Sequence, residues 1–243
     1  MAGVPEPRSG AGASAARMGQ QQLDAERGRQ HTTARWALPA AGVGGLVLVL
    51  ALGGTWWLGV LLALVLVGAV ARRVYRLAGN SWTKGAAGER RTAKLLVPLQ
   101  RDGWHALHDR SIPGSRANVD HLLIGPAGAL MVDSKFWTSK KSALRVQGGR
   151  LWYGRYDQTK TLQTAVWEAQ QAARALGVPV ATIVAVHGAT VPGGVVMLEG
   201  ATVVPASRLR HLVRNLSPVQ GFDSARVQRL ADLAERTLPP HTS

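Results

Sequence analysis

A run of 36 residues without a charged side chain, from Trp36 to Ala71, limits how this 243-residue chain can fold more than any other feature. One membrane-crossing helix needs about 20 apolar residues. The run is too long for one untilted helix but long enough for two short ones, and Gly53 and Gly54 can turn the chain between them. We therefore expect two helices, over about 36–52 and 56–71.

Basic residues on both sides of the apolar run indicate its orientation. They are Arg27, Arg29 and Arg35 before it, and Arg72, Arg73 and Arg76 after it. Because basic flanks stay in the cytoplasm, both ends lie on one side and the chain crosses an even number of times. This favours a transmembrane helical hairpin in a bacterial cell membrane, with the rest of the chain in the cytoplasm. A single span and a hairpin buried in a soluble domain are the alternatives.

Most of the positive charge follows the apolar run. Residues 1–71 contain five Arg and three acidic residues, net +2, whereas residues 72–243 contain 24 Lys or Arg and 11 acidic residues, net +13. Such an excess attracts polyanions, either nucleic acid or anionic lipid headgroups. An Arg-rich proteome would produce the same excess without any partner. The absence of Cys excludes disulfides and thiolate metal sites.

Composition and periodicity divide the chain into five parts. We expect a disordered cytoplasmic tail over 1–35, the hairpin over 36–71, a basic linker over 72–81, a folded domain over 82–204 and a helical extension over 205–243. In the domain, a helix over 84–97 precedes strands over 103–109, 118–124 and 128–135, a hairpin over 142–153, a helix over 160–176 and a strand over 179–187. This order predicts an α/β fold with a mixed central sheet flanked by helices.

Two acids and a lysine interrupt an apolar hairpin in NVDHLLIGPAGALMVDSKFW, residues 118–137. If the turn is centred on residues 126 and 127, residues whose numbers add to 253 pair, and Asp120 faces Asp133. Lys135 shares their face because strand side chains alternate. Opposed carboxylates share a proton or bind a cation such as Mg²⁺ or Mn²⁺. A bulge at Gly128 would instead pair Asp120 with Ser134 and move one acid to the other face.

A third acid, Glu89, is predicted on the inner face of the helix over 84–97. Its neighbours at i−3, i+4 and i+7 are Ala86, Ala93 and Leu96. Gly88 would let this helix approach the sheet closely. For Glu89 taken alone, a solvated helix position is the alternative.

Three segments together resemble the nuclease-related domain, NERD, of the PD-(D/E)XK nuclease superfamily. They are KGAAGERRTAKLL, NVDHLLIGPAGALMVDSKFW and WEAQQAARAL, and the resemblance covers about residues 82–180. It implies a restriction-endonuclease-like fold and a metal-dependent nuclease that hydrolyses phosphodiester bonds of DNA, or of RNA. Together with the apolar run, it predicts that this nuclease is membrane-tethered and acts at the cytoplasmic face. The family more often has Glu where Asp133 stands. A non-catalytic module that binds nucleic acid, or a membrane-linked scaffold with the same fold, is the alternative.

The resemblance also implies roles for individual residues. Asp120 and Asp133 would hold Mg²⁺ or Mn²⁺, the Ser134 carbonyl would add a ligand, and Glu89 would bind the ion directly or through water. Lys135 would orient the attacking water or stabilise charge on the phosphate.

Two further groups of residues complete the expected site. By family analogy, Gln170 on the helix after the sheet lies beside the catalytic residues. The segment after the acid–x–lysine motif is basic and aromatic, a mixture that grips phosphates and stacks bases. Its expected nucleic-acid contacts are Lys140, Lys141, Arg145, Arg150 and Trp152. A solvated hairpin whose aromatic rings belong to the core is the alternative.

Overall fold

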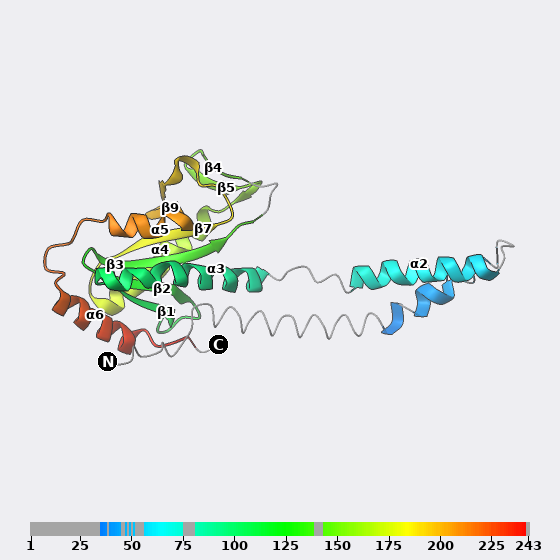
Figure 1. The fold of residues 1–243 in the computed structure, drawn as a ribbon, viewed down its shortest axis with the longest axis horizontal. Helices are drawn as coiled ribbons and strands as arrows, with labels where there is room; N and C mark the ends of the chain where they lie inside the picture. The colour runs from blue at the N-terminus through cyan, green and yellow to red at the C-terminus, as the bar shows by residue number, and fades with distance from the viewer. Residues whose placement is uncertain are drawn as a thin grey trace. The chain divides into compact units, whose positions relative to one another are not determined.

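The computed structural model describes residues 35–37, 39–44, 47, 49, 51, 56–74, 81–138 and 143–241. They divide between two compact units, one that holds the apolar run and one that begins at Trp82 (Figure 1). The predicted tail up to residue 34 and residues 75–80 of the predicted linker lie outside the described residues.

Helix α2, Trp56–Val74, belongs to the apolar unit. Trp56 and Leu64 on this helix are 71% and 65% exposed. Among the described residues, no helix is both long enough and apolar enough to cross a membrane. The predicted pair of membrane-crossing helices is therefore not supported. The uncharged residues 56–71 of α2 extend about 24 Å, against roughly 30 Å of hydrocarbon core, and the predicted helix over 36–52 lies only partly within the described residues.

The second unit is built on a six-stranded sheet in the order β1-β2-β3-β7-β9-β8. The strands are β1 His105–Ser111, β2 Asn118–Gly125, β3 Gly128–Phe136, β7 Val180–His187, β8 Val196–Leu198 and β9 Ala201–Pro205. Strands β1, β2 and β3 pair antiparallel, β3, β7 and β9 pair parallel, and β8 runs antiparallel to β9. The predicted α/β fold with a mixed central sheet is confirmed.

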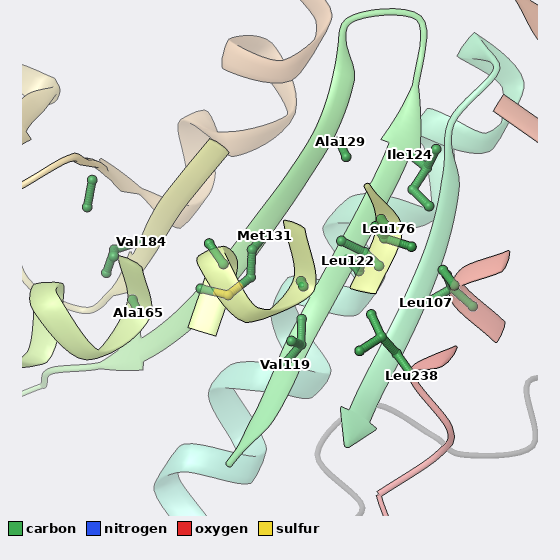
Figure 2. Packing of buried hydrophobic residues seen from close by; sticks show 14 of the residues in the cluster. Leu107, Val119, Leu122, Ile124, Ala129, Met131, Ala165, Leu176, Val184 and Leu238 are labelled. Carbon is green, nitrogen blue, oxygen red and sulfur yellow. The ribbon is translucent and has the colours of Figure 1, made fainter. Parts of the chain in front are cut away.

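Helices cover both faces of this sheet. One face packs on α3, Ser81–Leu96, the 3-10 helix η1, Val97–Asp102, and α5, Ala206–Arg214. The other face packs on α4, Thr159–Leu176, and α6, Ser224–Thr237. Figure 2 shows this second core, where Leu122 of β2 and Met131 of β3 lie near Ala165 and Leu176 of α4. With both faces covered, β3 is buried over most of its length.

The β2–β3 pairing follows the predicted register. Gly125 pairs with Gly128 across a two-residue turn, and His121 pairs with Val132, so paired residue numbers add to 253. The bulged alternative is wrong. On β3, Leu130 and Val132 face α3, whereas Met131 faces α4. The pairing includes His121, the residue after Asp120, but not Asp120 itself, so β2 leaves β3 at the predicted site.

Candidate active site

Asp120 lies at the point where β2 leaves β3. Its Oδ2 accepts a hydrogen bond of 2.9 Å from the backbone amide of Ser134. The carboxylate thus replaces the carbonyl that a continued ladder would offer to this amide. Burial, followed by repulsion from Glu89 and Asp133, holds the pKa of Asp120 well above its usual range. Asp120 and Asp133 therefore interact electrostatically although they do not form a ladder pair.

Asp133 and Lys135 point from β3 to the side of the sheet that α4 covers, because they alternate with residues that face α3. The Lys135 ammonium donates a hydrogen bond of 2.7 Å to Asp133 Oδ1. Burial alone would lower the pKa of Lys135, but Asp133 and Asp120 outweigh this effect and raise the pKa above its ordinary value. Lys135 therefore carries a full positive charge beside the acids at any physiological pH.

Glu89 is buried on α3, as its spacing in the helix predicts, with 7% of its surface exposed. Burial, with repulsion from Asp109 and Asp133, raises the pKa of Glu89 to about 7. Glu89 Oε2 and Asp133 Oδ2 are both buried and have no hydrogen-bond partner among the described residues. A buried carboxylate oxygen without a partner is costly, so these two atoms are candidate ligands for a cation.

Two acids that the sequence reading missed also interact with these residues. Burial and repulsion from Asp133 raise the pKa of Glu168 on α4 to about 8. Gln170, two residues later, is exposed, whereas Ala169 beside it is buried against the sheet. The spacing of the buried alanines in α4 could have predicted that Glu168 lies near the sheet. Glu168 directly precedes the buried Ala169 and follows the buried Ala165 by three residues.

Asp109 on β1 is the second missed acid. It is fully buried, has a left-handed φ of 51°, and accepts a hydrogen bond of 2.9 Å from Asn118 Nδ2. Its backbone carbonyl accepts the amide of His241 near the end of the chain. A non-glycine residue in this conformation is strained, and such strain collects at functional sites. No pattern along the chain could have placed Asp109 beside Glu89, because the approach depends on the packing of α3.

The donor atoms of this cluster fit a divalent cation. Glu89, Asp120 and Asp133 offer hard oxygen donors, and two of those oxygens are buried without a partner. Over the part of the chain that the structure describes, no group of three or more His, Cys, Asp or Glu side chains already has the arrangement of a metal site. The cluster therefore supplies the donors, and their convergence on an ion requires side-chain adjustment.

A chain of hydrogen bonds crosses the sheet beneath the acids, on the face that α3 covers. It joins His108 to His121 at 2.9 Å, His121 Nε2 to Ser134 Oγ at 3.2 Å, Ser134 to Thr92 at 2.8 Å, and Thr92 to His187 Nε2 at 2.8 Å. Burial lowers the pKa of all three histidines, so they are neutral.

The donors in this chain follow from one another. Ser134 donates its only hydroxyl hydrogen to Thr92, so its oxygen accepts from His121 Nε2–H. Neutral His121 must then accept at Nδ1 from His108. Thr92 donates to His187 when His187 Nε2 is unprotonated and accepts from it in the other tautomer. Each inner member neighbours a candidate acid, because Thr92 lies one helical turn after Glu89, His121 follows Asp120, and Ser134 follows Asp133. The chain thus ties the helix and the two strands that carry the site.

Replacing Thr92 by valine is expected to lower the free energy of unfolding by about 1–3 kcal/mol, because the isosteric side chain leaves Ser134 and His187 without their buried partner. Denaturant titration measures the change. Thr92→Ser keeps the hydroxyl and is expected to restore most of the stability. Thr182→Val, which removes a buried hydroxyl from β7 outside this chain, is the matched control. A Thr92→Val protein as stable as the wild type would contradict the prediction.

The expected nucleic-acid contacts lie mostly on a separate three-stranded sheet, formed by β4 Leu144–Gln147, β5 Arg150–Tyr153 and β6 Tyr156–Asp157. Arg145 lies over the Trp152 ring at 5.8 Å, and Arg150 forms an exposed ion pair of 3.3 Å with Asp157. Lys140 and Lys141 lie outside the described residues. Both described arginines of this group are therefore already engaged within the small sheet.

Comparison with known proteins identifies the region that contains this cluster. The family model of the nuclease-related domain, NERD, matches residues 84–190. No curated protein and no solved structure matches the chain. The matched region runs from α3 to the loop after β7 and includes all the acids of the cluster as well as Lys135. Residues 84–190, less than half of the chain, are therefore similar to the nuclease-related domain.

Proposed function

We propose that the nuclease-related domain hydrolyses phosphodiester bonds of nucleic acid, DNA in the first place and RNA in the second, with Mg²⁺ or Mn²⁺ as its metal. The observation that carries the proposal is a pair of buried oxygens, Glu89 Oε2 and Asp133 Oδ2, that have no partner among the described residues, together with the Lys135 ammonium bound to Asp133. A site for a neutral ligand would not gather acids whose charges repel one another. A bound cation would reduce that repulsion, and the lysine ammonium would stabilise negative charge on a phosphate of the substrate.

The proposed role of each residue follows from its position and charge. Glu89, Asp120 and Asp133 would hold the cation. When bound, it would polarise the phosphate and lower the pKa of a coordinated water. Lys135, kept charged and oriented by Asp133, would stabilise the negative charge that develops on the phosphate. Glu168, whose pKa of about 8 lies near neutral pH, is suited to exchange a proton during hydrolysis.

A cleavage assay with the full chain tests the proposed function. Supercoiled plasmid, single-stranded DNA and RNA are incubated with Mg²⁺, with Mn²⁺ or with chelator, and the products are separated by size. We expect cleavage only with metal, and we expect Asp133→Asn to abolish it while the matched exposed variant Asp157→Asn retains it. Cleavage in chelator, or full activity of Asp133→Asn, would contradict the proposal.

A non-catalytic module that binds nucleic acid is the second candidate. It is favoured by the direct Lys135–Asp133 ion pair and by the lack of a preformed group of three metal-binding side chains among the described residues. This candidate predicts that labelled oligonucleotides bind the full chain but stay intact with every divalent metal tested.

A further inference from the structure

Three basic side chains form a stripe on the outer face of α3. Ala87, Arg90, Arg91 and Lys94 follow the spacing i, i+3, i+4 and i+7, which places them on one side of the helix. They line a shallow depression of about 270 Å³, and the three cations are exposed. We call these four residues the α3 basic stripe. The small side chain of Ala87 leaves room between the longer ones.

Among the described residues, no acid forms an ion pair with a cation of the stripe. Within the described ranges, the ion pairs involve Lys135, Arg150 and Arg214, and none involves a residue of the stripe. The Arg91 guanidinium lies 4.9 Å from the centre of the Phe136 ring, and Phe136 directly follows Lys135. This contact holds one cation of the stripe at the end of β3 that carries the candidate site.

The stripe and Glu89 lie on the same helix, α3. Glu89 is buried on the inner side of α3, and Arg90 next to it is close enough to oppose the rise of the pKa of Glu89. Arg91 likewise acts on His187 at the end of β7. An anion bound beside Arg91 would therefore lie at the end of β3 that carries Lys135 and Phe136.

We propose that the α3 basic stripe binds the phosphate backbone of the nucleic acid next to the bond that the domain cuts. This inference rests on the proposed function and adds the surface that holds the substrate. Apart from Ala87, the stripe offers only one ammonium and two guanidinium groups, with no aromatic or amide side chain among its members. Such groups position a backbone but do not read base edges from there. Binding through the stripe is thus independent of sequence.

The test compares the wild type with a triple variant, Arg90→Gln, Arg91→Gln and Lys94→Gln, of the full chain. Fluorescence anisotropy follows the binding of two duplex oligonucleotides of unrelated sequence over a series of salt concentrations. Chelator is present throughout, so nothing is cut and binding is measured apart from catalysis. A control variant, Arg210→Gln, Arg229→Gln and Arg236→Gln, removes the same charge from exposed positions of α5 and α6.

We expect the triple variant to raise Kd at least about 10-fold for both sequences and to lower the slope of log affinity against log salt by about 2–3, since each lost phosphate contact contributes about 0.9. The control variant should change affinity much less. An equal loss in both variants, or a loss for only one sequence, would overturn the inference.

An anionic membrane surface offers similar charge, so vesicles that contain phosphatidylserine form a second arm of the experiment. If the triple variant keeps its affinity for oligonucleotides but no longer binds vesicles, the stripe is a lipid contact and the inference fails. Failure of the proposed function looks different. In that case the wild type binds oligonucleotides through the stripe in chelator but cuts nothing when metal is added.

Discussion

Replacing Lys135 by methionine is expected to lower the rate of nucleic-acid cleavage by about 10²–10³-fold, as the loss of one group aimed at a developing negative charge does in other enzymes. Lys135 is the partner of Asp133 at 2.7 Å, and its pKa is raised, so it is charged throughout the working range of pH. Methionine keeps the length of the side chain but removes the charge. The loss should fall mainly on kcat, because the interaction strengthens in the transition state. Steady-state cleavage of a short labelled oligonucleotide measures it.

Lys160→Met provides the matched control, because this lysine is exposed at the start of α4. It should leave kcat within about twofold of the wild type, since a lysine exposed at the start of the helix touches no developing charge. Circular dichroism of the Lys135→Met protein checks that the domain is folded, because the substitution leaves Asp133 without its ion pair. A folded Lys135→Met protein with wild-type kcat would refute the role given to this lysine.

Without divalent metal, the protein is expected to lose stability as the pH rises from about 5 to about 8. The pKa of Glu89 is raised from 4.5 to about 7 by burial and by neighbouring acids, so the folded state binds more protons than the unfolded state between these values. Stability therefore falls as the pH increases through that window, by on the order of 3 kcal/mol for a shift of this size. Glu168, with its pKa raised to about 8, acts in the same direction. Denaturant unfolding in chelator at several pH values measures the slope.

Two comparisons separate this effect from a general dependence on pH. Glu89→Gln cannot ionise and should flatten the slope between pH 5 and pH 7. Mg²⁺ or Mn²⁺ should restore stability most strongly at high pH, because the ionised carboxylates are the ligands. A slope of the opposite sign, or one that Glu89→Gln leaves unchanged, would show that the buried carboxyl of Glu89 is not the source.

Several features of the fold were predictable because they depend on local pattern. Alternating apolar residues and a two-residue turn set the pairing of β2 with β3, so the register could be worked out from residue numbers. The spacing of Glu89 with apolar neighbours in the helix correctly predicted its burial. The order of helices and strands predicted a mixed sheet for the same reason, since periodicity reports which face of an element is buried.

The apolar run and Gln170 were not predictable in the same way. A count of uncharged residues predicted two membrane-crossing helices, but among the described residues no helix is long and apolar enough to cross. Gln170 was placed by analogy, yet it is exposed, and Glu168 on the same helix interacts with Asp133. A shift of two residues changes the face of a helix by about 160°, which analogy between segments does not resolve.

The sequence by itself determined the mixed α/β fold, the register of the β2–β3 hairpin and the inward side of Glu89, because each follows from periodicity within one or two adjacent elements. Only the tertiary structure decided which groups meet across the sheet. The bond from the His241 amide to the Asp109 carbonyl, the repulsion between Glu168 and Asp133, and the hydrogen-bond chain through Thr92 join elements far apart along the chain. These interactions depend on burial and on distances between charges in the folded protein, which the spacing of residues along the sequence does not determine.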